Sequence, residues 1–370
     1  MTKPERVLIV GAGPVGLAAA VEFRRRGFHP RIIDAGEGPT DVAQSRALGI
    51  LPTTLDILAA SGITGRLLAE GGRIDKAEIS RDGRHLFRIS TRPARTRHNF
   101  ILTLPQGRTE RLMIEWLAAR DIAVEWNTAF VSLADTHAPR VRLSNGEIVA
   151  ADLVLGADGV HSAVREDIGI PWNGAGYPAE FALADVVFER PIDASTARAN
   201  LRTANGGAGG AVALLPLGET KGRYVGIAPS TAALLAGIEG IAAVTWESRF
   251  SVSFRHAERM ARGRVFLAGD AAHVHSPVGG RGMNLGIWDA AWLAYLASEG
   301  RQSEYEMRRM PSVRRVLEDT RRMTDVIAAP PQRVLTTLRY AMPLATRLPW
   351  VRRKIAERLL ALDLPQPEWL

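Results

Sequence analysis

An α/β fold, in which a first domain is interrupted by a second domain rich in β-strands, is the fold class that the sequence predicts. Three observations lead to it. The chain opens with a short apolar run, a glycine-rich turn and a segment of helical periodicity; its middle part carries several short runs of β type; and the pattern of the opening returns from residue 264. With 370 residues, of which 46% are hydrophobic and 23% charged, the chain is long enough for two domains of ordinary globular composition.

The composition excludes several kinds of site. The chain has no cysteine, which rules out disulfides, thiolate metal sites and cysteine nucleophiles and agrees with a cytoplasmic location. A formal charge of +8, from 47 Lys and Arg against 39 Asp and Glu, suits an anionic small molecule, acidic lipids or nucleic acid, or reflects a soluble arginine-rich surface. No apolar run is long enough for a signal peptide or a transmembrane span, and we expect no nucleic-acid partner.

The first 34 residues have the pattern of a β-α-β unit. Residues 6–10 and 30–34 read as strands, and residues 17–26 as a helix that Gly27 ends. In a G-x-G-x-x-G turn the glycines allow a tight turn, close approach of the backbone to a pyrophosphate and close packing of helix on strand, while a carboxylate after the second strand holds a ribose hydroxyl. The pattern predicts a dinucleotide site at the N-terminus of the helix. Its expected residues are Gly11, Gly13, Pro14, Val15, Gly16 and Asp34.

The rest of the chain does not continue as a regular alternation of strands and helices. We expect a hairpin over residues 77–89 around RDGR, a helix within residues 102–120 and a turn at SNGE, residues 144–147. Short runs at 181–188, 211–217 and 223–227 read as strands of the second domain, and the chain from Ser303 onward reads as helical. We therefore assign residues 1–75, 100–175 and 254–330 to the first domain, 76–99 and 176–253 to the second, and 331–370 to a C-terminal helical segment.

A second glycine-rich segment, GDAAHVHSPVGGRGMN at residues 269–284, lies late in the chain. Its Asp270 is either a carboxylate that binds a ligand or the N-cap of a following turn. His273 and His275 have a spacing that suggests a metal, but Asp270 is the only carboxylate beside them in the motif, so we expect no metal. No second G-x-G-x-x-G occurs, which argues against a reductase with two dinucleotide-binding domains.

Three motifs in this order make the chain resemble the class A FAD-dependent monooxygenases of the p-hydroxybenzoate hydroxylase fold: GAGPVG at residues 11–16, GADGVHSAVR at 156–165 and the late motif. The resemblance implies one non-covalent FAD, with the N-terminal unit on the ADP half and Asp270 on the ribityl hydroxyls. It also implies that Pro277 and the backbone of residues 279–284 line the flavin ring, and that Arg46 and Gln106 lie near FAD. The central motif would serve both FAD and NAD(P)H. The further contacts that the resemblance implies are Asp158, Gly159, His161, Arg165, Gly269, Gly280, Gly282, Met283 and Asn284.

The same resemblance implies a reaction. NADH or NADPH reduces FAD, O2 adds at flavin C4a, and the hydroperoxide hydroxylates an aromatic or similarly electron-rich small molecule. The alternative is a reductase or dehydrogenase of the same fold, similar to prenyl reductases, which inserts no oxygen. A base that would activate a phenolic substrate stays unassigned, because the candidates Tyr177, Arg202, Tyr224 and His98 also suit structural roles.

Pro277 and Arg281 are the residues expected nearest to the reaction. Arg281 stands where the family most often has glutamine. If its cation faces the flavin, it favours the anionic reduced ring. Alternatively, the side chain points to solvent or to a carboxylate.

The C-terminal stretch LPWVRRKIAERLLAL, residues 348–362, has the pattern of an amphipathic helix. It either packs on the FAD-binding domain as a closing helix or makes weak contact with a membrane surface. We expect the protein to be a monomer or a homodimer.

Overall fold

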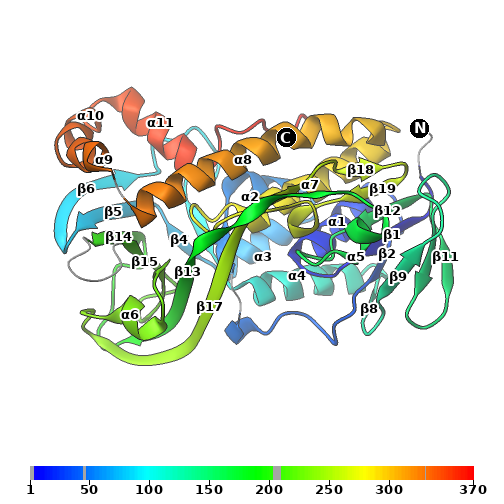
Figure 1. Cartoon of the computed structure of the whole chain (residues 1–370), viewed down its shortest axis with the longest axis horizontal. Helices are drawn as coiled ribbons and strands as arrows, with labels where there is room; N and C mark the ends of the chain where they lie inside the picture. The colour runs from blue at the N-terminus through cyan, green and yellow to red at the C-terminus, as the bar shows by residue number, and fades with distance from the viewer. Residues whose placement is uncertain (1–3, 45–46, 203–209, 330) are drawn as a thin grey trace.

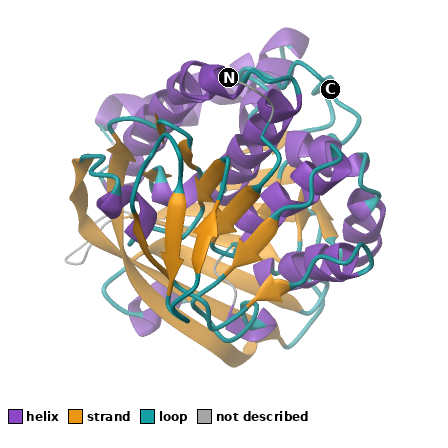
Figure 2. Cartoon of the chain, turned by 90° about the vertical axis from the view of Figure 1, so that its right-hand side faces the viewer, coloured by secondary structure: helices purple, strands orange, loops and turns teal. Residues whose placement is uncertain are grey.

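The structure is a computed structural model that describes residues 4–44, 47–202, 210–329 and 331–370. In Figure 1 the N-terminal strands lie at the right of the view, and two very long strands cross to a second sheet at the left. Turned by 90°, the strands occupy the centre, with helices above and to the right of them (Figure 2). The chain is therefore an α/β protein with more than one sheet.

The first sheet has six strands, and its middle is parallel. Its central strand pairs with β12 on one side and with β2 on the other, as a β-α-β unit requires. All four residues of β1 are buried, which agrees with the apolar run in the sequence. In spatial order the strands are β18 (Ala261–Arg262), β19 (Val265–Leu267), β12 (Leu153–Gly156), β1 (Val7–Val10), β2 (Arg31–Ile33) and β8 (Val124–Glu125).

Helix α1 (Pro14–Arg25) follows β1 directly and packs against the late helix α7 (Gly282–Ser298). Proline in its first turn suits the helix start, and Arg24 and Arg25 in its last turn suit the helix dipole. α7 is buried on nearly every side, so segments far apart in the sequence share one core. The other elements of this part are η1 (Val42–Gln44), α2 (Pro52–Ala59), α3 (Ile63–Glu70), α4 (Gln106–Ala118), α5 (Ala163–Asp167) and η2 (Gly269–Ala271).

Two small antiparallel sheets accompany the six-stranded sheet. One is formed by β3 (Gly49–Ile50), β7 (Ile101–Thr103) and β4 (Gly72–Ile74). The other consists of β9 (Phe130–Leu133), β10 (Arg140–Leu143) and β11 (Ile148–Ala150). The turn predicted at SNGE joins β10 to β11 and is confirmed, with Gly146 at φ +88°.

The second sheet has eight strands, and two of them are 17 residues long. The predicted hairpin is confirmed as β5 and β6, with Asp82 and Gly83 at positive φ in the turn. The predicted strands are also present, but β13 starts nine residues before the expected 181, and the sequence did not indicate β17 or β14 at all. In spatial order the strands are β20 (His273–Val274), β17 (Ile241–Ala257), β13 (Trp172–Phe188), β16 (Lys221–Ile227), β15 (Gly210–Pro216), β14 (Thr196–Arg202), β5 (Lys76–Arg81) and β6 (Arg84–Ser90). Helix α6 (Thr231–Leu235) packs on β13, β16 and β17.

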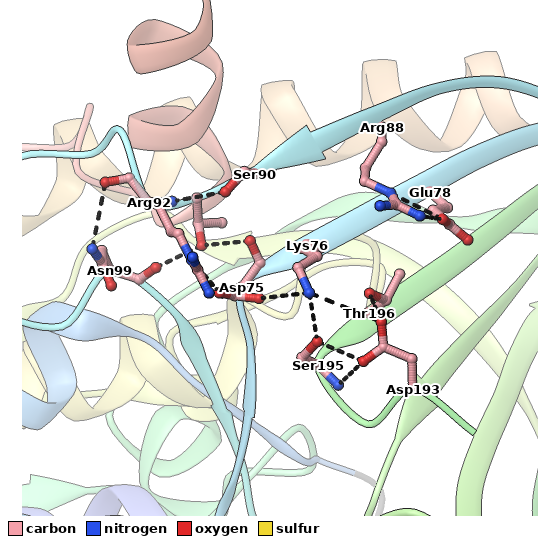
Figure 3. Close-up of polar contacts among 11 residues, drawn as sticks. Asp75, Lys76, Glu78, Arg88, Ser90, Arg92, Asn99, Asp193, Ser195 and Thr196 are labelled. Carbon is pink, nitrogen blue, oxygen red and sulfur yellow. Dashed lines mark hydrogen bonds and ion pairs between the residues drawn. The ribbon is translucent and has the colours of Figure 1, made fainter. Parts of the chain in front are cut away.

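Polar contacts hold the hairpin to this sheet, although it lies more than 100 residues away along the chain. Figure 3 shows Lys76 between Asp75 and Ser195, and its Nζ is 3.0 Å from Ser195 Oγ. At the base of the hairpin itself, Arg92 after β6 pairs with Asp75 before β5, with Nε 2.7 Å from Oδ2. The parallel pairing of β5 with β14 thus joins two distant parts of the chain into one sheet.

Helices make up most of the described chain between residues 305 and 359, as predicted, but residues 360–370 form turns and irregular chain instead of a helix. The helices are α8 (Tyr305–Ala328), α9 (Gln332–Thr336), the π-helical turn η4 (Thr337–Ala341), α10 (Met342–Ala345) and α11 (Pro349–Leu359), after the short turn η3 (Gln302–Glu304). α11 packs against β6 and buries Ala356 and Leu360 with Ala94. Within the described residues, none of the helices has the length and apolar character needed to cross a membrane.

Candidate FAD site

The three glycines of the N-terminal turn have different surroundings. A Cβ on Gly11, which has φ +102°, would lie 2.3 Å from the carbonyl oxygen of Ala157, and a Cβ on Gly16 would lie 1.8 Å from the carbonyl oxygen of Gly11. Close packing within the chain therefore requires these two glycines. Around Gly13 no atom of the described residues lies within 4 Å of the same position, so its backbone is open to an approaching group. Gly13 is the N-cap of α1, whose first turn holds no acidic side chain and leaves free N–H groups for an anion.

Asp34 lies directly after β2 and is joined to this turn. Its Oδ2 accepts the N–H of Ala12 at 2.6 Å, and its Oδ1 accepts the N–H of Gly36 at 2.7 Å. Each carboxylate oxygen has further lone-pair capacity, so these bonds orient the carboxylate without using up its ability to accept a hydroxyl. The side chain thus stands where the sequence pattern expects a ribose partner.

The late glycine motif touches the first one through Val15. A Cβ on Gly269, which has φ +60°, would lie 2.8 Å from Val15 Cγ2, and one on Gly286 would lie 2.6 Å from the same atom. Glycine at both positions allows η2 and α7 to approach the start of α1. Motifs more than 250 residues apart are thereby adjacent.

Asp270 lies in η2, and its side chain is exposed. Within the described part of the chain it accepts no hydrogen bond and forms no ion pair, so its role as a helix cap is not supported. The surrounding protein raises the pKa of Asp270 by desolvation, and nearby His273 opposes that effect. An accessible carboxylate at the edge of the glycine turns, with no partner in the described part of the protein, fits the hydroxyl-rich chain of FAD.

A buried network supports η2 from behind. Asp289 of α7 accepts from Arg309 Nε at 2.7 Å and lies 2.6 Å from His273 Nε2, and all three side chains are at most 1% exposed. The N–H of Gly269 also points to Asp289 Oδ2, at 3.3 Å. Burial alone would raise the pKa of Asp289, but Arg309 and His273 hold it below its usual range. The sequence did not single out Asp289 or Arg309, and no local pattern marks either.

The central motif, residues 156–165, connects β12 to α5. Asp158 accepts from Ser162 Oγ at 2.6 Å and from the N–H of Val164 at 3.1 Å, which caps the start of α5. Burial raises the pKa of Asp158, opposed by these hydrogen bonds. Gly159 has φ +81°, and His161 is exposed. The motif thus starts α5 and leaves His161 facing outward.

Arg165 was expected to contact a cofactor, but its guanidinium is used within the protein. It is 3% exposed, lies 4.1 Å from the ring centroid of Trp172, and donates to the carbonyl oxygens of Ala271 and Val160. Desolvation lowers its pKa. Arg165 therefore ties the central motif to η2.

Gln106 begins α4, and its Nε2 donates to Glu110 Oε1 at 2.8 Å. Glu110 is buried and also accepts from Thr40, so this contact ties α4 to the loop after β2. Arg46 lies outside the described residues.

The loop before α7 is a turn held at both ends. The N–H of Gly280 donates to the carbonyl oxygen of Pro277, and Gly279 and Gly280 both have positive φ. Pro277 and Gly280 are exposed, whereas Gly282 and Met283 are half-buried. At the start of the loop, Ser276 Oγ lies 2.6 Å from Thr324 Oγ1 of α8.

Asn284 closes the other end of the loop. Its Oδ1 accepts from the N–H of Leu51 and from Thr54 Oγ1, and its Nδ2 donates to the carbonyl oxygens of Gly49 and Gly280. The amide therefore has two acceptor and two donor contacts within the protein. The side chain of Asn284 thus joins α7 to residues 49–54, while the expected contact of its backbone with FAD stays a prediction.

Arg281 does not present a free cation, which corrects the first of the two expectations for this residue. It is 5% exposed, and its Nη2 donates to the carbonyl oxygen of Arg358 at 2.8 Å. Its guanidinium also lies 3.9 Å from carboxylate oxygens of Asp319 and Asp363. The alternative, a side chain directed to carboxylates, is the one that the structure shows.

An aromatic wall stands beside the loop. Val278 packs on a cluster from β13, β16 and β17, whose members are Phe181, Val252, Phe254, Tyr177, Ile227 and Phe250. Phe181 and Phe250 stack with centroids 5.8 Å apart. The exposed turn at 277–280 therefore faces an apolar sheet surface.

Only Tyr177 of the four candidate bases belongs to this wall. Its hydroxyl donates to Asp325 Oδ1 at 3.0 Å, and burial together with Asp325 raises its pKa. The other three lie elsewhere among the described residues: Arg202 bonds the carbonyl oxygens of Ala233 and Ala236, Tyr224 packs against Phe188, and His98 lies 3.6 Å from Asp56.

Comparison with known proteins agrees with this geometry. The family described as FAD binding domain matches residues 5–234 and 233–320. A 6-methylpretetramide 4-monooxygenase of Streptomyces rimosus is 36% identical over 354 residues, which cover 87% of this chain and 62% of that protein. A rifampicin monooxygenase of Streptomyces venezuelae is 31% identical, with 88% of this chain and 72% of that protein covered. The chain thus spans only part of the length of these relatives.

Solved structures show the same fold. The OxyS anhydrotetracycline hydroxylase from Streptomyces rimosus aligns with a TM-score of 0.75 at 30% identity, covering 98% of this chain and 77% of that one. The Diels-Alderase PyrE3 aligns with a TM-score of 0.77 at 25% identity, covering 96% and 80%. These findings confirm the predicted fold, family and cofactor. The chain belongs to the class A FAD-dependent aromatic monooxygenases.

Proposed function

We propose that this protein uses FAD, NADH or NADPH, and O2 to hydroxylate an aromatic small molecule. The observation that carries the proposal is the contact of the two glycine motifs through Val15. It brings the N-terminus of α1 next to the carboxylate of Asp270, which has no partner among the residues that the structure describes. An extended cofactor with a pyrophosphate and a hydroxyl-bearing chain needs both.

The residues of the site divide the work of binding FAD. The backbone N–H groups of Gly13, Val15 and Gly16 hold the pyrophosphate, and Pro14, which has no N–H, shapes that turn together with Val15. Asp34 accepts a ribose hydroxyl, and Asp270 accepts from the ribityl hydroxyls. Gln106, Gly269, Gly282 and Met283 border the cofactor. Bound FAD supplies hydride acceptance from NAD(P)H and activation of O2.

The chain's own contribution to the reaction is placement and exclusion of water. The turn at Pro277 and Gly280 lies along the ring of FAD, while Val278 and the aromatic wall form an apolar surface for a flat substrate. Tyr177, held by Asp325, orients a polar substituent of that substrate. His161 is available to NAD(P)H at the surface.

We also propose a weak contact of the C-terminal segment with anionic membranes. Residues 333–358 carry seven Lys and Arg against one Glu, most of the surplus of the whole chain. Leu335 and Leu338 pack toward the sheet, while Tyr340 and Leu344, on the opposite side of the helical segment, are 65% and 64% exposed. Exposed aromatic and apolar groups among cations suit an anionic lipid interface.

Co-sedimentation tests this contact. The protein should bind vesicles of phosphatidylserine and phosphatidylcholine but not phosphatidylcholine alone, and Trp350→Ala, which removes a side chain 61% exposed, should weaken binding. Equal recovery with both vesicle types would contradict it. Light scattering of the purified protein decides between monomer and homodimer. The absence of cysteine suits the proposed cytoplasmic location.

The catalytic proposal has a direct test. The purified protein should be yellow and should release one FAD per chain on denaturation. A panel of phenols, quinolones and polyketide aromatics is then scored for substrate-stimulated NADH and NADPH oxidation, O2 uptake and transfer of label from isotopic O2 to product. Oxidation of NAD(P)H without label in the product would identify a reductase instead. A protein that binds no FAD would overturn the whole proposal.

A further inference from the structure

Arg281 connects the loop before α7 with the C-terminal segment. The residue is the N-cap of α7, four positions after Pro277, yet its guanidinium reaches across to Arg358 at the end of α11. The contact joins residues 77 positions apart in the sequence. Leu51, Trp288 and Leu364 lie around the same narrow gap, so part of the Arg281 side chain has apolar neighbours.

Two carboxylates receive this charge, and each is shared with a second arginine. Asp319 of α8 also accepts from Arg358 Nη2 at 3.2 Å, and Asp363 also accepts from Arg315 Nη2 at 3.0 Å. Three cations therefore compete for two anions. Desolvation lowers the pKa of Arg281, and Asp363 and Asp319 oppose that effect.

The ion pairs of Arg281 are loose. Its Nη1 and Oδ1 of Asp363 are buried and make no hydrogen bond to any described residue, and the guanidinium lies 3.9 Å from both carboxylates. A displacement of about 1 Å would bring either pair to hydrogen-bond distance. Small movements of the C-terminal segment are thus coupled electrostatically to the loop.

We propose that Arg281 is a positioning residue through which residues 358–363 set the position of the loop 277–282 against FAD. This rests on the proposed function of that loop. Ser276 and Asn284 fasten the two ends of the loop, and Arg281 is the attachment between them that reaches the C-terminal segment. The exposed turn of Pro277 and Gly280 takes its place from all three attachments.

Hydrogen exchange of the FAD-loaded protein tests the coupling. Arg281→Gln and Asp363→Asn should each accelerate amide exchange by about tenfold both in residues 277–282 and in 358–364, and should raise the dissociation constant of FAD severalfold. Arg322→Gln, on the exposed face of α8, is the matched control and should change neither segment. Arg281→Lys keeps the charge without the planar fork and should fall between wild type and Arg281→Gln.

The outcomes separate this inference from the proposed function. Acceleration confined to the mutated segment, or an unchanged affinity for FAD in both variants, would overturn the positioning role. If exchange rises in both segments although no aromatic compound is hydroxylated, the coupling stands and the proposed function fails. If Arg281→Gln does not fold, Arg281→Lys and Asp363→Asn carry the same comparison.

Discussion

Replacing Asp289 by asparagine tests how the buried network supports the FAD site. Asp289 is fully buried and is the shared acceptor for Arg309, His273 and the N–H of Gly269. Asparagine keeps the shape but has no charge and only one acceptor oxygen. Arg309, itself 0% exposed, would be left as a buried cation without a counter-ion among the described residues.

The expected loss of stability follows from the isolated charge of Arg309. Removing one partner of a buried ion pair costs about 3–5 kcal/mol, because the remaining charge stays out of water. For 370 residues, an unfolding entropy of about 2.1 cal/mol/K per residue corresponds to about 0.8 kcal/mol per degree. Asp289→Asn should therefore lower Tm by about 4–6 °C. Because Gly269 precedes Asp270, FAD affinity should fall as well.

Urea unfolding and calorimetry of the apoprotein measure the loss. Glu318→Gln is the control, since its pair with Arg322 lies on the surface of α8 with side chains 62% and 69% exposed, and such pairs contribute at most about 1 kcal/mol. Asp289→Asn combined with Arg309→Met should recover most of the stability, because both charges are then removed. A loss below about 1 kcal/mol for the single variant, or no recovery in the double variant, would refute the reasoning.

Three further predictions concern the same site. Gly13→Ala should leave apoprotein stability unchanged but weaken FAD binding, because a Cβ there meets no atom of the described residues within 4 Å, whereas Gly16→Ala should unfold or strongly destabilise the protein. Equal thermal shifts of the two variants would contradict this. Asp270→Ala should raise the dissociation constant of FAD by about ten- to hundredfold, since a hydrogen bond to a charged group contributes about 1.5–3 kcal/mol; titration of apoprotein followed by flavin fluorescence measures it, and unchanged affinity would exclude the ribityl role. Burial, aided by His273, lowers the pKa of His275 to about 4, so the folded apoprotein should lose stability as pH falls from the unfolded pKa of about 6.5 through about 4. The loss should reach about 3 kcal/mol at the acid end and be absent in His275→Gln, as urea titrations at several pH values would show.

Several elements of the fold could be predicted from short segments of the sequence. The β1-turn-α1 start, the hairpin of β5 and β6 and the turn between β10 and β11 each depend on residues a few positions apart, with Gly11, Gly83 and Gly146 supplying the positive φ that the turns need. The long strands were less visible. β13 begins in a stretch with Gly174, Gly176 and Pro178, and most of β17 is half-buried or exposed, so no apolar run marks either. Their mutual pairing, with a register shift after Gly176, makes them strands.

The sequence by itself predicted that the two glycine motifs, Asp34 and Asp270 belong to the candidate FAD site, because a glycine turn next to a strand and a helix is a local property of the chain. Only the tertiary structure decided what the neighbouring polar side chains do. Asn284 and Arg281 lie in the same motif, but their partners come from residues 49–54 and 319–363, and Asp289 acquires its role from Arg309. The direction of a long or polar side chain depends on which distant groups can satisfy its hydrogen bonds and charge in the folded core, and the local sequence does not contain those groups.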